Sequence, residues 1–271
     1  MWKRLGAVAT IAIAAALVAA CSGQQAQQPK QQTKTTKPSA TSGQTTSAVK
    51  APVEATGTPY TVKLDPNDFV SGVTNPYWPL KVGTHWVYRT TTADGVEKND
   101  VVVTDQTKTI LGIKAVVVHD TVTVDGSLTE DTFDWYAQEK DGTVWYLGED
   151  TKELENGKVT STAGTWEAGV NGAQPGVIMQ ANPKAISTPS PWYWQEFYKD
   201  QAEDQARTLS VTGTATVPAG TYNGLLVTEE RSPIEPTVVE QKYYLPGLGV
   251  VLERTTKGAR EVSVLVSRTQ Q

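Results

Sequence analysis

The sequence predicts a mainly β protein: a single antiparallel meander, strongly curled into a half-barrel or an up-and-down barrel. Three observations predict it: short runs of alternating apolar residues, the β-branched and aromatic side chains that fill those runs, and regularly spaced Asx-Gly dipeptides. Half-buried strands favour such side chains, and Asx-Gly accepts the positive φ angles of tight hairpins. Strands do not alternate with helical patterns, so a parallel sheet is not expected.

The first residues have the features of a bacterial lipoprotein signal. Lys3 and Arg4 precede an apolar stretch, residues 5–20, which is shorter than the roughly 20 residues of a membrane-spanning helix and typical of a secretory signal peptide. Val18 to Cys21 resembles a lipobox, with an aliphatic residue and two small residues before the cysteine. We expect residues 1–20 to be removed and Cys21, the only cysteine, to carry acyl chains. One cysteine also excludes an intramolecular disulfide.

Residues 21–57 form a predicted lipid-anchored tether. Gln, Thr, Lys, Ser and Pro dominate this segment, which contains no aromatic residue. Such a composition cannot bury enough apolar surface to offset its conformational entropy, so we expect disorder with a root-mean-square span of ~30–36 Å. The predicted location is the cell membrane or outer membrane, facing outside the cytoplasm.

Residues 58–271 form the predicted antiparallel β-domain. Residues 1–57 carry a net charge of +5, and the domain carries −10, which argues against a nucleic-acid partner. Strands are expected around residues 84–88, 101–103, 113–118, 121–124, 143–147, 225–227 and 262–266. Turns are expected at residues 94–95, 112, 125–126, 141–142, 156–157, 171–172 and 223–224. This spacing leaves strands of roughly 9–12 residues, longer than the usual ~5–6 and typical of a curled sheet or barrel.

One hairpin shows two distinct faces. Because side chains alternate along a strand, an apolar face is expected from Phe133, Trp135, Ala137, Trp145 and Leu147. The opposite face is polar and aromatic, and it is expected to carry Glu130, Asp134, Tyr136, Gln138 and Tyr146. We expect the first face in the core and the second either facing water or lining a concave surface.

The region 175–210 departs from the meander. Four prolines interrupt it, and it holds an aromatic cluster that includes Trp192 and Trp194. Residues from about 195 to 209 are good helix formers after a proline. We therefore expect an irregular or short helical segment that caps one end of the sheet.

Catalytic signals are few. There is no G-x-S-x-G elbow, Walker loop or dinucleotide fingerprint, and the two histidines, His85 and His119, lack zinc-ligand spacing. We expect both to be half-buried strand histidines, and we expect no catalytic residue, metal ligand or cofactor. Carboxylates beside Trp and Tyr are found in sugar-cleaving clefts, and clustered acidic oxygens bind calcium, but the solvated strand of an acidic protein has the same composition and is the favoured interpretation. The candidates for a sugar-cleaving pair are Glu130, Asp134, Glu149 and Glu196.

Aromatic residues give the most suggestive functional signal. Seven tryptophans follow the signal peptide, with ten tyrosines and only three phenylalanines. Trp and Tyr combine an apolar ring with a polar tip, which suits glycan stacking and half-wet cavities. We therefore predict a glycan- or lipid-binding surface at Asp134, Tyr136 and Tyr146, with Trp192 and Trp194 at its rim. The favoured function is a non-enzymatic envelope binding or assembly module. The alternatives are a polysaccharide hydrolase and a structural partner that uses an open sheet edge.

Several stretches together resemble an uncharacterised family of secreted or lipid-anchored bacterial envelope β-proteins. They are Asp134–Gln138, Gly142–Glu149, Gly164–Gly169, Pro175–Met179, Val217–Tyr222 and Tyr243–Val251. The resemblance implies a curled, half-barrel β-fold and an envelope address. It implies no established activity, so no functional residue follows from it.

Overall fold

The computed structural model describes residues 60–271. The signal peptide, the tether and the acylation of Cys21 lie outside these residues and stay predictions. The strands before the irregular segment are β1 (Phe69–Val70), β2 (Thr84–Thr91), β3 (Val96–Ile110), β4 (Ile113–Val124), β5 (Ser127–Glu139), β6 (Val144–Glu155), β7 (Lys158–Ser161), β8 (Trp166–Glu167) and β9 (Gln174–Met179). Those after it begins are β10 (Tyr193–Trp194), β11 (Glu196–Phe197), β12 (Gln205–Val217), β13 (Gly220–Arg231), β14 (Val239–Leu245), β15 (Gly249–Lys257) and β16 (Val262–Gln270). Two 3₁₀ turns, η1 (Pro66–Asp68) and η2 (Pro183–Ala185), are the helical elements of the described part.

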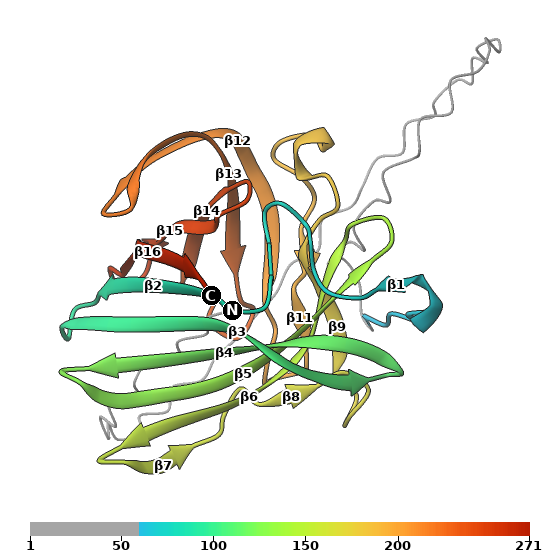
Figure 1. Ribbon diagram of the computed structural model, residues 1–271, viewed down its shortest axis with the longest axis horizontal. Coiled ribbons are helices and arrows are strands. Elements are labelled where there is room, and N and C mark those ends of the chain that lie inside the picture. Colours follow the sequence, from blue (N-terminus) through green and yellow to red (C-terminus); the bar gives the residue numbers. More distant parts are fainter. Residues whose placement is uncertain (1–59) are drawn as a thin grey trace, which may run out of the picture. The chain divides into compact units, whose positions relative to one another are not determined.

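The strands form one antiparallel sheet that curls into a nearly closed barrel (Figure 1). Its order is β10-β12-β13-β14-β15-β16-β2-β3-β4-β5-β6-β9-β11, with β1 added to β5 and with β7 and β8 added to β6. Along this order, each strand lies beside the next strand in sequence except where β16 pairs with β2, where β6 pairs with β9, and at the two short strands β10 and β11. The predicted fold class is confirmed, and β3 to β6 reach 12–15 residues each.

Most of the predicted turns are confirmed. Two-residue loops join the strands at Asp125-Gly126 and Asn156-Gly157, where φ lies between 50° and 79°, as Asx-Gly hairpins require. The turn predicted at Asn223-Gly224 is wrong, because both residues lie inside β13. There the positive φ of Gly224, 67°, accompanies a register shift against β12, so the dipeptide serves a β-bulge instead of a turn.

The segment before β12 is irregular, and no helix forms over residues 195–209. Glu196 and Phe197 form β11, and Gln205 begins β12. Pairing with sheet edges therefore overrides the local helical propensity.

One short segment joins the two edges of the sheet, and we call it the seam, Tyr193–Phe197. Tyr193 pairs with Ala206 of β12, whereas Glu196 pairs with Pro175 of β9. The chain approaches β9 very closely here, since a Cβ atom on Gly176 would lie 2.2 Å from the carbonyl carbon of Gln195. Only glycine fits at this position, and the barrel closes there.

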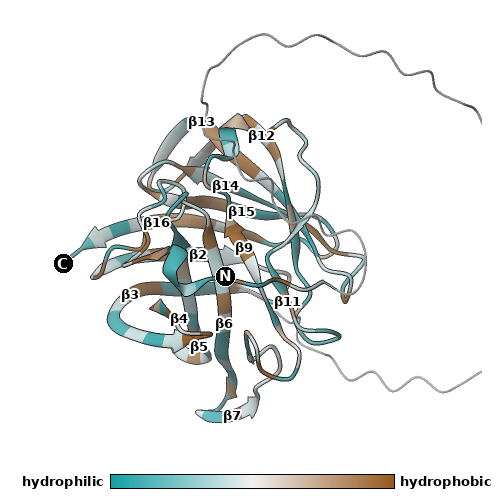
Figure 2. Cartoon of the chain, turned by 90° about the vertical axis from the view of Figure 1, so that its right-hand side faces the viewer, coloured by the Kyte–Doolittle hydropathy of each residue, from teal (hydrophilic) through white to brown (hydrophobic). Residues whose placement is uncertain are grey.

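Side chains alternate between the inside and the outside of the barrel. On β2, for example, Trp86 and Tyr88 are buried while Val87 is half-buried and Arg89 is exposed. Figure 2 shows hydrophobic residues along β9 and part of β6, and hydrophilic ones in β7. The outer apolar face of β5 and β6 is also covered, because Trp135 is 6% exposed and Lys108 places its ammonium group 3.4 Å from the Trp135 ring centroid.

Candidate functional site

The predicted polar-aromatic residues of β5 and β6 come together inside the barrel. The Tyr146 hydroxyl donates a hydrogen bond to Asp134 Oδ1 at 2.6 Å, and the rings of Tyr136 and Tyr146 stack with centroids 4.8 Å apart. Each of these three residues is 1% exposed. Asp134, Tyr136 and Tyr146 thus lie on the concave face of the sheet, which is the second of the two predicted alternatives. Other side chains cover this face and exclude water from it.

Further acidic residues surround these tyrosines. Glu149 lies directly opposite Asp134 in the β5–β6 register, and Asp120 accepts a hydrogen bond from the Asn99 amide. We call Asp120, Asp134, Tyr136, Tyr146 and Glu149 the acidic-tyrosine cluster. Burial, followed by the neighbouring carboxylates, raises the pKa values of Asp120 and both tyrosines well above their ordinary values.

The seam contributes one more carboxylate to this region. Trp166 donates from Nε1 to Glu196 Oε2 at 2.9 Å, and its ring meets the Tyr146 ring edge-on at 5.3 Å. Glu196 is 1% exposed. Asp134, Glu149 and Glu196 are therefore buried and do not point separately into solvent.

Trp192 and Trp194 contact other parts of the molecule. The guanidinium groups of Arg231 and Arg207 lie 3.9 and 4.7 Å from the Trp192 ring centroid. Trp194 packs against Tyr60 and Phe197. Trp194 thus belongs to the seam, and Trp192 directly precedes it; that the two tryptophans rim a binding surface stays a prediction.

A second polar cluster, not predicted from the sequence, is buried in the other half of the sheet. Lys242 is 3% exposed, and its Nζ lies 2.6 Å from Glu230 Oε2 and 3.7 Å from Glu253 Oε1. We call Glu230, Glu240, Lys242 and Glu253 the lysine cluster. The only sequence signal is that Glu240, Lys242 and Tyr244 alternate on one face of β14.

Burial and like charges set the ionisation of this second cluster. Burial and then Glu253 raise the pKa of Glu240 to about 9. Burial also raises the pKa of Glu253 to about 7, against the opposing effect of Lys242. For Lys242 itself, burial lowers the pKa, but Glu230 and Glu253 outweigh burial and leave the pKa well above its ordinary value. Lys242 thus stays charged.

Both histidines are half-buried strand residues on the outer face, as predicted. His85 Nε2 lies 2.9 Å from Asp100 Oδ1, and His119 Nε2 lies 2.6 Å from Asp131 Oδ1. The Phe133 ring stacks on His119 with a centroid distance of 4.3 Å. Each imidazole is thus partly exposed and has a carboxylate partner on the outer face.

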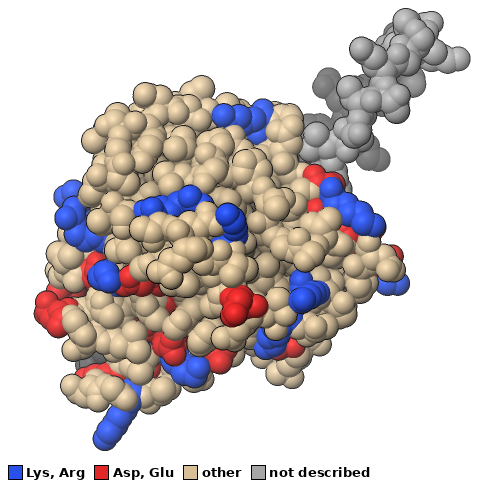
Figure 3. Space-filling view, in the orientation of Figure 1, with Lys and Arg blue, Asp and Glu red and all other residues tan. Residues whose placement is uncertain are grey.

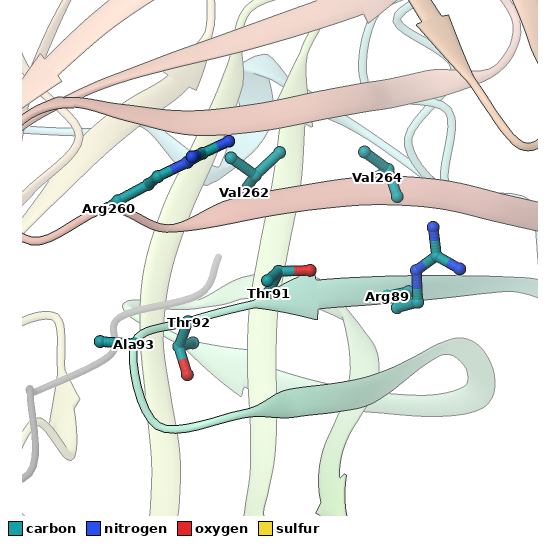
Figure 4. Close-up of a pocket in the computed structure, with 7 residues that line it drawn as sticks. All are labelled: Arg89, Thr91, Thr92, Ala93, Arg260, Val262 and Val264. Atoms are coloured by element: carbon teal, nitrogen blue, oxygen red, sulfur yellow. The ribbon is translucent and has the colours of Figure 1, made fainter.

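An open cavity of about 490 Å³ lies on the outer face where β2 meets β16, and we call it the arginine groove (Figure 4). Its lining residues come from these two strands and the loops at their ends: Arg89, Thr91, Thr92, Ala93, Arg260, Val262 and Val264. The pairing of Arg89 with Val264 and of Thr91 with Val262 brings the two ends of the domain sequence together. Sequence reasoning missed this site because nothing local indicates that β16 pairs with β2.

The arginine groove is positive in an acidic domain. Arg89 and Arg260 are exposed, and neither forms an ion pair with another described residue. No Asp or Glu lines the groove. A third arginine, Arg254, lies next to Val262 in the sheet and donates to Gln241 and the Tyr243 hydroxyl. Guanidinium groups beside valines suit a ligand that is both anionic and partly apolar.

Residues 60–271 contain neither a candidate metal centre nor a candidate membrane-spanning helix. No group of three or more His, Cys, Asp or Glu side chains in this part is placed to hold a metal ion. This part also contains no helix that is long and apolar enough to cross a membrane.

Comparison with known proteins gives no family assignment. No protein family and no curated protein matches the chain in sequence. Among solved structures, a candidate exported protein with a YmcC-like fold from Bacteroides fragilis is 16% identical with a TM-score of 0.44, over 72% of this chain and 99% of that one. A candidate lipoprotein from Parabacteroides distasonis is 13% identical with a TM-score of 0.38, over the same shares of the two chains. Both TM-scores are below 0.5.

Proposed function

We propose that this protein is a lipid-anchored binding module of the bacterial cell envelope that has no enzymatic activity of its own. The proposal joins the signal and tether read from residues 1–57 to the β-domain of residues 60–271. The observation that carries it is the arginine groove, where two valines and two arginines, neither of them in an ion pair with a residue of the described part, line one open cavity. The proposed ligand is an anionic, partly apolar glycan or lipid.

The placement of the carboxylates supports a binding role over a catalytic one. A glycoside hydrolase needs two carboxyl groups at a cleft that the sugar can enter. Asp134 and Glu149 lie side by side but are 1% and 3% exposed. The groove, in contrast, is open and contains no carboxylate. This difference in exposure supports binding at the groove over hydrolysis at Asp134 and Glu149.

The anchor is tested by location. We expect the Cys21→Ser chain to move from the membrane fraction to the soluble fraction of the producing cells, because it cannot be acylated. Immunoblotting of the two fractions checks this, with the wild-type chain as reference. A Cys21→Ser chain that stays with the membrane would contradict the anchor and leave the groove proposal untouched.

The groove is tested by direct titration. The full chain in detergent micelles is titrated calorimetrically with a uronic-acid oligosaccharide, its neutral counterpart, and micelles containing phosphatidylglycerol or phosphatidylcholine. We expect binding of an anionic ligand only, and a loss of at least about tenfold in the Arg89→Gln/Arg260→Gln variant, because charge-assisted hydrogen bonds contribute ~1.5–3 kcal/mol each.

Lys114→Gln provides the matched control, because Lys114 is also exposed but lies on β4, away from the groove. It should bind like the wild type. Equal binding of neutral and anionic ligands, or an Arg89→Gln/Arg260→Gln variant that binds normally, would reject the proposal. Release of sugar from envelope polysaccharide that is abolished by Asp134→Asn would favour the hydrolase instead.

A further inference from the structure

The distal part of the β12–β13 hairpin extends beyond its neighbours in the sheet, and we call residues 209–225 the arm. On the β12 side, β10 pairs only with Gln205 and Ala206. The Ser190 amide donates a hydrogen bond to the Thr208 carbonyl, and the Ser190 hydroxyl accepts one from the Thr208 amide. On the β13 side, pairing with β14 begins at Leu226. Within the described residues, the arm thus has an unpaired strand edge on each side. It is the hairpin that arches over the top of Figure 1.

The arm is unusual because it carries no charge. From Thr208 to Thr228 there is no Lys, Arg, His, Asp or Glu, in a chain of which 20% is charged. Figure 3 shows few charged side chains at the top of the molecule, where Figure 1 places the arm. Proteins commonly protect exposed strand edges with charges, prolines or bulges. Here, register shifts occur only between Thr208 and Thr214, which leaves Thr214–Val217 as a regular edge.

The arm is an ordered element of the barrel. Its tip is attached to β16, because the Ala219 amide donates to the Leu265 carbonyl at 3.1 Å. The Tyr222 hydroxyl donates to the Ala219 carbonyl at 2.9 Å. Ala215 and Val217 are buried, whereas Thr214 and Thr216 are exposed. The edge is thus held in a fixed position with its hydroxyl side chains outward.

We propose that this edge pairs with the same edge of a second copy, so that the protein self-associates by antiparallel β12–β12 pairing around a two-fold axis. Such an interface places each surface against itself, so it must be free of like charges. The β-domain carries a net charge of −10, and this like charge opposes the close approach of two copies at most other surfaces. The arm has no charged side chain, so two arms do not repel each other. Threonines that face one another across paired strands also stabilise the pairing.

The regular edge is short, so the pairing is weak for molecules free in solution. The proposed lipid anchor at Cys21 would confine copies to one surface and raise their effective concentration. We therefore expect the equilibrium to shift to dimers as copies become crowded. The interface is independent of the arginine groove, whose residues belong to other strands.

Sedimentation equilibrium of the full chain in density-matched detergent micelles tests the proposal. We expect a monomer–dimer equilibrium whose association constant falls at least about tenfold in Thr214→Lys/Thr216→Lys, because lysines would oppose one another across the axis. Both threonines are exposed, so the variant should fold, which its circular dichroism spectrum and thermal midpoint verify.

Thr123→Lys is the control, since Thr123 lies on central strand β4, which pairs with strands on both sides. It should associate like the wild type. A wild-type chain that stays monomeric up to the highest concentration would overturn the proposal. Dimers that persist in Thr214→Lys/Thr216→Lys would also overturn it, and their loss in Arg89→Gln/Arg260→Gln would place the contact at the groove instead.

Discussion

The two polar clusters of the barrel stabilise carboxylates that are shielded from water, but they do so with different partners. The acidic-tyrosine cluster surrounds its carboxylates with neutral donors, including the Tyr146 hydroxyl and the Asn99 amide. The lysine cluster places one cation, Lys242, among carboxylates on three neighbouring strands. Buried charge is costly unless it is paired and hydrogen-bonded. The first cluster should therefore depend on many small contributions, and the second on a single side chain.

The largest expected effect follows from removing that side chain. Lys242→Met should lower the free energy of unfolding by ~3–5 kcal/mol, because breaking a buried ion pair leaves uncompensated charge. Denaturation with urea measures it. The control is Lys152→Met, which removes a partly exposed lysine paired with Asp150 at 3.2 Å and should cost ~0–1 kcal/mol. Equal losses in the two variants would contradict the special role of the lysine cluster.

The same cluster predicts how stability depends on pH. The folded pKa values of Glu240 and Glu253, about 9 and about 7, exceed the unfolded value of ~4.3. The folded state therefore binds more protons. This contribution is complete below the unfolded pKa and is lost as pH rises through 7 and towards 9. We expect the free energy of unfolding to fall between pH 5 and pH 9, measured by urea denaturation.

Glu240→Gln tests the assignment of this pH dependence, because it removes the group with the higher of the two pKa values. The variant should show a smaller loss of stability between pH 7 and pH 9 than the wild type. A wild-type protein whose stability increases from pH 5 to pH 9 would show that other groups dominate.

A smaller effect is expected in the acidic-tyrosine cluster. Tyr146→Phe keeps the ring that stacks on Tyr136 but removes the hydrogen bond to Asp134. We expect a loss of ~1–3 kcal/mol, the cost of leaving a buried acceptor with one donor fewer, measured by urea denaturation. Tyr222→Phe, which removes a partly buried hydrogen bond at the arm, should cost less. The reverse order would mean that other donors replace Tyr146.

The smallest effect is expected on the outer face. His119→Gln removes the contact with Asp131, whose side chain is 27% exposed, and we expect a change of no more than ~1 kcal/mol. Thermal unfolding at pH 5.5 and pH 8 measures it. A loss as large as that of Tyr146→Phe would mean that the outer face contributes to stability as much as the interior.

Local signals in the sequence predicted the fold well where the structure is decided locally. Asp125-Gly126 and Asn156-Gly157 form turns because the dipeptide alone sets their φ angles. The turn predicted at Asn223-Gly224 is wrong because a positive φ angle also suits a β-bulge. The helix considered over residues 195–209 does not form because this segment pairs with strands that are distant in the sequence.

The candidate site was predictable only in part. Alternation placed Asp134, Tyr136 and Tyr146 on one face, which the register confirms. Their burial depends on the opposite wall of the barrel, which alternation within one hairpin cannot reveal. The arginine groove depends on the pairing of β2 with β16, a contact between the two ends of the domain that no short motif encodes. Ligand binding by the predicted residues stays a prediction.

The pairing of β16 with β2 also decides when the barrel can form. In the strand order of the described residues, β2 to β6 with β9 form one run of paired strands and β12 to β15 form another, and the seam and β16 join the two runs. Because β16, Val262–Gln270, follows all the other strands in sequence, a growing chain holds two incomplete sheets until this strand is available. Loss of β16 (Val262–Gln270) would separate these sheets along one side and remove one wall of the arginine groove. Strand β16 therefore completes the domain.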